Sequence, residues 1–200
     1  MAGERELLIE FRDLIEAIAE DSIAAEKARR SNDNPTNRRN VVRVLFSAVE
    51  AEVYQRKRLA LFRHSEGQVP FTPAELALLR EEQYTLNHKG EAEPKPIFLR
   101  LTENFQFSAR MLCKAYGLTY AIDKSGAGWK AFCDAIAIRN RITHPKHVHD
   151  LSIEEAEFKT IADASRWYRA EAVRLIGLIG EKLSVVEPTP PPTPTGFSTA

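Results

Sequence analysis

The chain has 200 residues, 44% of them apolar, and 28 basic residues balance 28 acidic ones. This length and composition predict one globular domain with its own core. Zero net charge argues against a protein that coats nucleic acid or binds membranes through a polybasic surface, although a local basic patch stays open. The N-terminal segment has no signal-peptide h-region and no apolar run reaches bilayer length, so we expect a cytoplasmic protein with no membrane partner.

Helical periodicity dominates the sequence, and alternating strand patterns are scarce. Pro35 breaks the first long helical pattern and Gly117 is well placed to end another. The predicted helices cover about 4–30, 38–62, 73–87, 97–116, 128–144 and 153–183. The stretch 88–96 is expected to be a loop. The predicted fold class is therefore all-α, a helical bundle of five to six helices.

Two helix starts carry capping signals. Thr72 precedes Pro73, and Glu75 stands where its side chain can complete a capping box. Ser152 and Glu155 have the same spacing before the last helix.

Composition divides the chain into two parts. Residues 1–186 are expected to form a single all-α domain, and the proline-rich stretch 187–200 is expected to be a disordered tail. Cys113 and Cys133 stand among apolar residues in helical patterns, which indicates two buried thiols in a reducing compartment, with a disulfide left open.

The fifth predicted helix ends in polar residues that continue its apolar face. Residues three or four apart share a helix face, so Ile136 lies on the same side as Arg139 and Asn140, and Asn140 leads to His144. Pro145 ends the helix, because the residue before a proline is pushed out of helical geometry. A guanidinium at the end of a core-facing stripe needs partners.

The second predicted helix supplies such partners. Arg43, Glu50 and Lys57 are spaced by sevens and share one stripe, and the rest of the helix is apolar enough to be central. We expect Arg43 and Glu50 to lie near the polar end of the fifth helix, with Glu50 paired to an arginine and Lys57 in the same supporting group. Arg141 is expected to face solvent.

Arginine and histidine at this spacing suit phosphodiester chemistry. Arginine is the natural fork for a phosphate, and histidine titrates near neutral pH and serves as general acid or base. His144 would activate a ribose 2′-hydroxyl or protonate the leaving oxygen, and Arg139 would stabilise the phosphorane-like transition state. RNA supplies its own nucleophile in this reaction, so no metal and no cofactor is required.

An all-α bundle carrying Arg139, Asn140 and, four residues later, His144 resembles the HEPN domains, many of which are RNA-cleaving toxins or defence effectors. The resemblance implies a metal-independent endoribonuclease, with Arg139 binding phosphate, His144 as acid and base, and Asn140 orienting them. It also implies a homodimer whose two Arg–His sets share one cleft, an RNA substrate, and an antitoxin or regulatory protein as partner.

A structural interpretation of the same residues stays open. Arg139 would pair with Glu50, Asn140 would cap carbonyls at the helix end, and His144 would be a half-exposed terminal residue. The chain would then be a non-catalytic helical module that binds a protein, a nucleotide or RNA.

The loop after the fifth helix holds His144, His147, His149 and Asp150, but this spacing matches no strong metal-ligand pattern, so no metal site is predicted.

Further residues allow two interpretations each. Residues 27–63 carry ten Lys or Arg against three Asp or Glu, which suits an RNA-facing patch or, more commonly, a solvated helix face. Trp129, Trp167 and Tyr168 are expected in the core rather than as base-stacking platforms. Tyr54 lies close to the charged stripe, and core packing is favoured over a place in a cleft.

Overall fold

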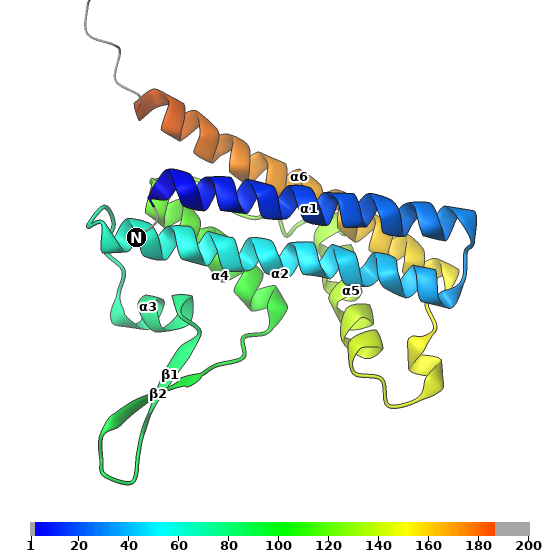
Figure 1. Ribbon diagram of the computed structural model, residues 1–200, viewed down its shortest axis with the longest axis horizontal. Helices are drawn as coiled ribbons and strands as arrows, with labels where there is room; N and C mark the ends of the chain where they lie inside the picture. The colour runs from blue at the N-terminus through cyan, green and yellow to red at the C-terminus, as the bar shows by residue number, and fades with distance from the viewer. Residues whose placement is uncertain (1–2, 187–200) are drawn as a thin grey trace, which may run out of the picture.

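The computed structural model describes residues 3–186, and residues 1–2 and the predicted tail 187–200 lie outside the described residues. The elements of the described chain are α1 (Glu4–Ser31), α2 (Pro35–Ser65), α3 (Pro73–Leu79), β1 (Glu82–Leu86), β2 (Ala92–Pro96), α4 (Leu101–Tyr116), α5 (Ala127–Thr143), the 3-10 helix η1 (Val148–Leu151) and α6 (Glu155–Val186). The predicted all-α helical bundle is confirmed (Figure 1). No helix in the described part of the chain is long and apolar enough to cross a membrane.

The bundle is built on two long antiparallel helices, α1 and α2 (Figure 1). The turn between them is fixed by Asn34, whose side chain accepts a hydrogen bond from the backbone N–H of Asn37 at 2.9 Å, and by Pro35 in the first turn of α2. Helix α2 contacts α1, α3, α4, α5 and α6, so its predicted central position is confirmed.

The core consists of two apolar clusters that share α2 and α6. The first cluster includes Leu7, Phe11, Leu59, Leu112, Leu175 and Ile179. The second includes Val49, Phe105, Phe132, Ile142, Ile161 and Tyr168, with Trp129 and Trp167 packed against it. The two tryptophans and Tyr168 are thus core residues, as expected.

Helices α5 and α6 approach each other closely at Gly128. A Cβ atom on Gly128 would lie 2.3 Å from Cδ1 of Trp167, well inside van der Waals contact. The indole ring of Trp167 lies 5.0 Å from the ring of Phe132, centroid to centroid. Because Gly128 has no side chain, Trp167 of α6 can pack directly against α5.

The predicted helix over 73–87 is wrong beyond its first two turns. Its capping box forms: Thr72 N–H donates to the Glu75 carboxylate at 2.8 Å, and Glu75 N–H donates to the Thr72 hydroxyl at 3.2 Å. The helix ends at Leu79, however, and the chain turns into an antiparallel β-hairpin.

The β1–β2 hairpin occupies much of the stretch expected to be a loop. Its strands pair from Glu82 opposite Pro96 to Leu86 opposite Ala92, and Gly90 adopts a positive φ of 78° in the turn. Pro94 lies within β2, where its missing N–H is tolerated because the strand is at the edge of the sheet.

Smaller corrections concern helix ends. Helix α4 begins at Leu101, later than predicted, and ends at Gly117, which has the expected left-handed conformation (φ 60°). The capping box expected from Ser152 and Glu155 does not form. Instead, the backbone N–H of Glu154 donates to the Glu157 carboxylate at 3.1 Å. Both cysteines are free thiols.

Candidate functional site

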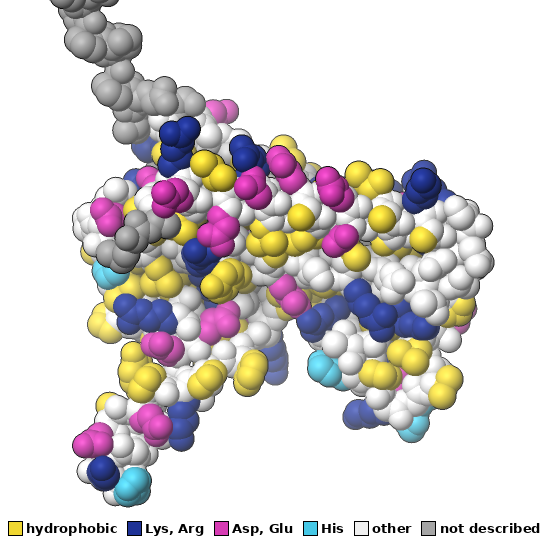
Figure 2. All heavy atoms as spheres, in the orientation of Figure 1, with side chains coloured by type: hydrophobic (Ala, Val, Ile, Leu, Met, Phe, Trp, Pro, Cys, Tyr) yellow, Lys and Arg dark blue, Asp and Glu magenta, His cyan; other side chains and the backbone are white. Residues whose placement is uncertain are grey.

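A large cleft lies between two projections of the bundle. The hairpin extends from one end of α2, and the end of α5 with η1 extends from the other, so the surface is hollowed between them (Figures 1 and 2). The large cleft has a volume of about 780 Å³, and the lining residues used below are Glu50, Tyr54, Glu81, Phe98, Arg139 and Asn140. A small cleft of about 370 Å³ adjoins it and includes Arg43, Ser47 and Thr143. Glu50 and Arg139 line both clefts.

Arg139 is held at the junction of the two clefts. Its Nη2 donates to Oε1 of Glu50, and its Nη1 donates to Oδ1 of Asn140 at 3.1 Å. The expected contact between Glu50 and an arginine is therefore present. The Arg139 side chain is 24% exposed and the Glu50 side chain 47%, so solvent reaches both charges.

The seven-residue stripe on α2 does not form one continuous charged surface. Arg43 is exposed in the small cleft, where its Nη1 donates to Asn40 Oδ1 at 3.4 Å. Lys57 is buried, and its Nζ donates to Glu81 Oε1 at 2.7 Å and to the carbonyl of Leu78 at 3.4 Å. The grouping of Lys57 with the Arg139 site is thus wrong, because α3 and the start of β1 cover that end of α2.

His144 lies outside both clefts. It follows the last residue of α5, its backbone N–H donates to the carbonyl of Asn140 at 3.0 Å, and its side chain is exposed. Its imidazole makes no hydrogen bond to any residue of 3–186. Its backbone leaves helical geometry (φ −123°, ψ 57°), and the preceding residue, Thr143, lines the small cleft. Arg139, Asn140, Glu50 and Arg43 line the two clefts, whereas His144 lines neither of them.

Arg141 anchors the segment after α5 and does not simply face solvent as expected. Its Nη1 donates to the carbonyls of Asp150 at 3.1 Å and Ser152 at 2.8 Å, and its Nη2 binds both oxygens of Glu157. Arg39 of α2 adds a hydrogen bond to the carbonyl of Leu151 at 2.8 Å. Sequence reasoning missed this clamp, because its acceptors are backbone carbonyls that become available only when η1 folds back.

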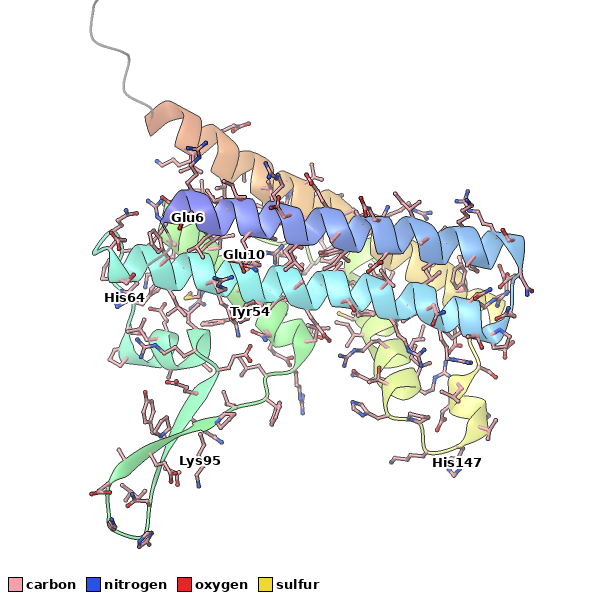
Figure 3. All side chains as sticks on the ribbon, in the orientation of Figure 1. Glu6, Glu10, Tyr54, His64, Lys95 and His147 are labelled. Carbon is pink, nitrogen blue, oxygen red and sulfur yellow. The ribbon has the colours of Figure 1, made fainter. Side chains whose placement is uncertain are left out.

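The histidine-rich loop is organised by Asp150. Its carboxylate accepts the backbone N–H groups of Lys146 at 2.8 Å and His147 at 2.9 Å, and these hydrogen bonds lower the pKa of Asp150. His147 and His149 stack with their ring centroids 5.2 Å apart, at the tip of the projection where Figure 3 labels His147. In the range 3–186 no group of three His, Cys, Asp or Glu side chains is placed to hold a metal ion.

Part of the basic run of residues 27–63 is engaged in ion pairs between elements. Arg38 binds Asp33 and Glu155, Arg58 binds Glu10, and Arg63 binds Glu4. Its arginines tie α2 to α1 and α6.

Tyr54 is not packed in the core as favoured. Its side chain is on α2, above the hairpin that carries Lys95 in Figure 3. It is 59% exposed and lines the large cleft. Tyr54 lies one turn after Glu50 on the same exposed face of α2, so its place beside the charged stripe was a sequence signal for exposure.

No protein-family model, no curated protein and no solved structure matches this chain. The fold and the site define this protein as an all-α bundle with an arginine–glutamate pair at the junction of two clefts.

Proposed function

We propose that this chain is a cytoplasmic, metal-independent endoribonuclease of the HEPN type. The observation that supports this most directly is the position of Arg139. Its guanidinium is partly exposed at the junction of the clefts and already binds one oxyanion, the Glu50 carboxylate. A phosphodiester carries the same kind of oxygen acceptors and would compete for the same fork.

The reaction proceeds by transfer within the RNA strand. His144 removes the proton of a ribose 2′-hydroxyl, whose oxygen attacks the adjacent phosphorus. The bond from phosphorus to the 5′-oxygen breaks, and that oxygen takes up a proton from the imidazolium of His144, so that the two proton transfers balance. The products are a 2′,3′-cyclic phosphate and a 5′-hydroxyl. Arg139 stabilises the charge on the non-bridging oxygens, and Asn140 holds the guanidinium in place.

The position of His144 makes a homodimer part of this proposal. Because His144 lines neither cleft of its own chain, the proposal includes a second copy that brings its histidine to Arg139, in a symmetric pair with two composite sites. An antitoxin or regulatory protein would then act by covering the clefts or by separating the two copies.

Mixing two inactive variants tests the composite site. Arg139→Ala and His144→Ala are each expected to be inactive. If the sites are composite, re-equilibrated mixed dimers contain one intact site, and a random mixture regains about a quarter of wild-type cleavage. A mixture that stays inactive while size-exclusion chromatography shows mixed dimers would contradict the shared site.

A second candidate function is a non-catalytic module that binds RNA through the same cleft. Two observations favour it: the Arg139 guanidinium is already paired with the Glu50 carboxylate, and His144 lines neither cleft of its own chain.

Induced expression separates the two functions. Growth and total RNA integrity are followed for the wild type, Arg139→Ala, His144→Ala and the matched control Arg166→Ala, an exposed α6 arginine paired with Asp163. A nuclease arrests growth and cleaves RNA in the wild type and the control only, with all variants folded by circular dichroism. Intact RNA throughout, with oligonucleotide binding lost only in Arg139→Ala, identifies the binding module.

A further inference from the structure

The wall of the large cleft opposite Arg139 contains a residue in an unusual conformation. Glu81 has φ +57°, and it is the only non-glycine residue of the described chain in the left-handed region. Several contacts hold it there. Its Oε1 accepts hydrogen bonds from Lys57 Nζ at 2.7 Å and Asn104 Nδ2 at 3.2 Å, and its carbonyl accepts the N–H of Ile97 at 2.8 Å. Such residues persist where the surroundings over-determine them, and they cluster at ligand sites.

Two acceptors on this wall have no donor. Oε2 of Glu81 receives no hydrogen bond from any residue of 3–186. Asn104 lines the cleft and is only 9% exposed, and its Oδ1 is buried without a partner. Burial raises the pKa of Glu81, but the hydrogen bonds from Lys57 and Asn104 outweigh it, so the pKa is lowered and the side chain is an anionic acceptor at neutral pH. A ligand with N–H donors would satisfy these oxygens.

Two aromatic side chains flank the same wall. Phe98 precedes α4 and is 97% exposed, and Tyr54 on α2 is 59% exposed. Aromatic faces of this kind are the platforms on which unpaired nucleobases stack. Arg100 lies in the same cleft and makes no side-chain hydrogen bond within the described residues, so it is available to a phosphate.

We infer that this wall is a nucleobase subsite for single-stranded RNA that prefers guanine, with Tyr54 or Phe98 stacking on the base and Glu81 accepting its N–H groups. The inference rests on the proposed RNA function and names its sequence preference. Guanine presents two adjacent donors, N1–H and the N2 amino group, and both can reach Glu81 Oε2, because Oε1 already accepts from Lys57 and Asn104. Adenine presents an acceptor at N1, which the Glu81 carboxylate would repel.

Binding to short RNAs tests the subsite. The full chain carrying His144→Ala, which prevents cleavage, is titrated with fluorescein-labelled single-stranded uridine oligonucleotides that contain one central guanosine, inosine, adenosine or uridine. Fluorescence anisotropy is expected to show about tenfold tighter binding of guanosine than of adenosine. Inosine, which lacks the N2 amino group, should fall between them.

Substitutions assign the preference to residues. When Glu81→Gln is added to the His144→Ala background, the four oligonucleotides should bind with equal affinity. The amide of glutamine offers one acceptor, and its N–H donor repels the N–H groups of guanine. It can keep the Lys57 contact through its oxygen, so the fold is expected to survive. Phe98→Ala should weaken the binding of all four oligonucleotides by a similar factor. Glu93→Gln, a matched change on an exposed glutamate of β2 that does not line the large cleft, should leave the guanosine preference intact.

The outcomes separate this inference from the proposed function. Equal binding of all four oligonucleotides that is still lost in Arg139→Ala overturns the guanine subsite and leaves the RNA site standing. Guanosine preference that survives Glu81→Gln assigns recognition elsewhere and also overturns the inference. Absence of binding to every oligonucleotide overturns the subsite and the proposed RNA function together.

Discussion

An ion pair in the middle of α2 is entirely buried. Glu52 and Arg56 join through Oε1 and Nη2 at 2.5 Å, and the guanidinium lies 4.7 Å from the ring centroid of Phe105. Among residues 3–186, no hydrogen-bond partner is found for Glu52 Oε2, Arg56 Nε or Arg56 Nη1. The attraction between the two charges therefore has to offset a large desolvation cost, and neither residue tolerates loss of the other.

Replacing one residue of this pair should lower the free energy of unfolding more than replacing both. Arg56→Met leaves Glu52 as an unpaired buried carboxylate and is expected to lower the free energy of unfolding by about 3–5 kcal/mol. The double variant Glu52→Leu/Arg56→Met should recover most of that loss, because no charge is left stranded. Urea denaturation at neutral pH measures both. Equal destabilisation by the single and double variants would contradict a compensated pair.

A second charged cluster predicts how stability depends on pH. Hydrogen bonds from Arg29, with help from Arg30, lower the pKa of Glu26 to about 2. Because the folded pKa lies below the unfolded one, the stabilisation is complete above the unfolded value of about 4.3 and is lost as the pH falls toward 2. Glu26→Gln should lower stability at pH 7 and flatten the stability profile over that range.

Urea denaturation at a series of pH values checks this prediction. Glu20→Gln is the matched control, since Glu20 is exposed on the same helix and makes no ion pair within residues 3–186. An unchanged acid slope in Glu26→Gln would show that other carboxylates carry the acid sensitivity.

At the site, the sequence predicted contacts made between helix faces better than contacts made by loops. The pairing of Glu50 with an arginine at the end of α5 followed from helical periodicity alone. The separation of His144 from Arg139 depends on the rotation of α5 in the bundle, which periodicity does not fix. The hydrogen bonds of Arg141 depend on where η1 lies after the turn that follows α5, which the sequence does not predict. The role of Glu81 depends on a left-handed backbone conformation that no residue pattern predicts.

Among the elements, the long amphipathic helices were predictable and the hairpin was not. Helices α1, α4, α5 and α6 each bury an apolar face, which produces a three-to-four-residue period, and the central helix α2 is buried on several sides. The strands β1 and β2 are short and mostly exposed, and two prolines interrupt the second. A two-stranded ribbon with little buried surface leaves almost no hydrophobic pattern.

The close approach of α5 and α6 makes a glycine essential at one position. Gly128→Ala places a methyl group against the Trp167 ring and is expected to destabilise the fold by about 1–3 kcal/mol through overpacking. Gly177→Ala is the control, because that α6 glycine has no atom within 4 Å of an added Cβ. It should stabilise the helix by about 0.5–1 kcal/mol. Chemical denaturation distinguishes the two, and destabilisation by Gly177→Ala would contradict this account.

At the scale of the whole molecule, the two apolar clusters are joined by α2 and α6. Each of these helices would lose half of its packing if one cluster unfolded alone, so we expect a single cooperative transition. Both tryptophans lie at the second cluster, whereas far-UV circular dichroism reports all helices. Denaturation curves from tryptophan fluorescence and from circular dichroism should therefore coincide. A fluorescence transition at lower denaturant would show that the second cluster unfolds independently.

The order of the helices along the chain also bears on folding during synthesis. The hairpin of α1 and α2 leaves the ribosome before α5 and α6 and can form from contacts that are local in sequence. The α2 face that carries Val49 and Phe46 is covered only after α5 and α6 are made. For the time needed to synthesise roughly a hundred further residues, at about 5–20 residues per second, the nascent chain would display this apolar face. It is a natural binding surface for a chaperone that acts at the ribosomal exit.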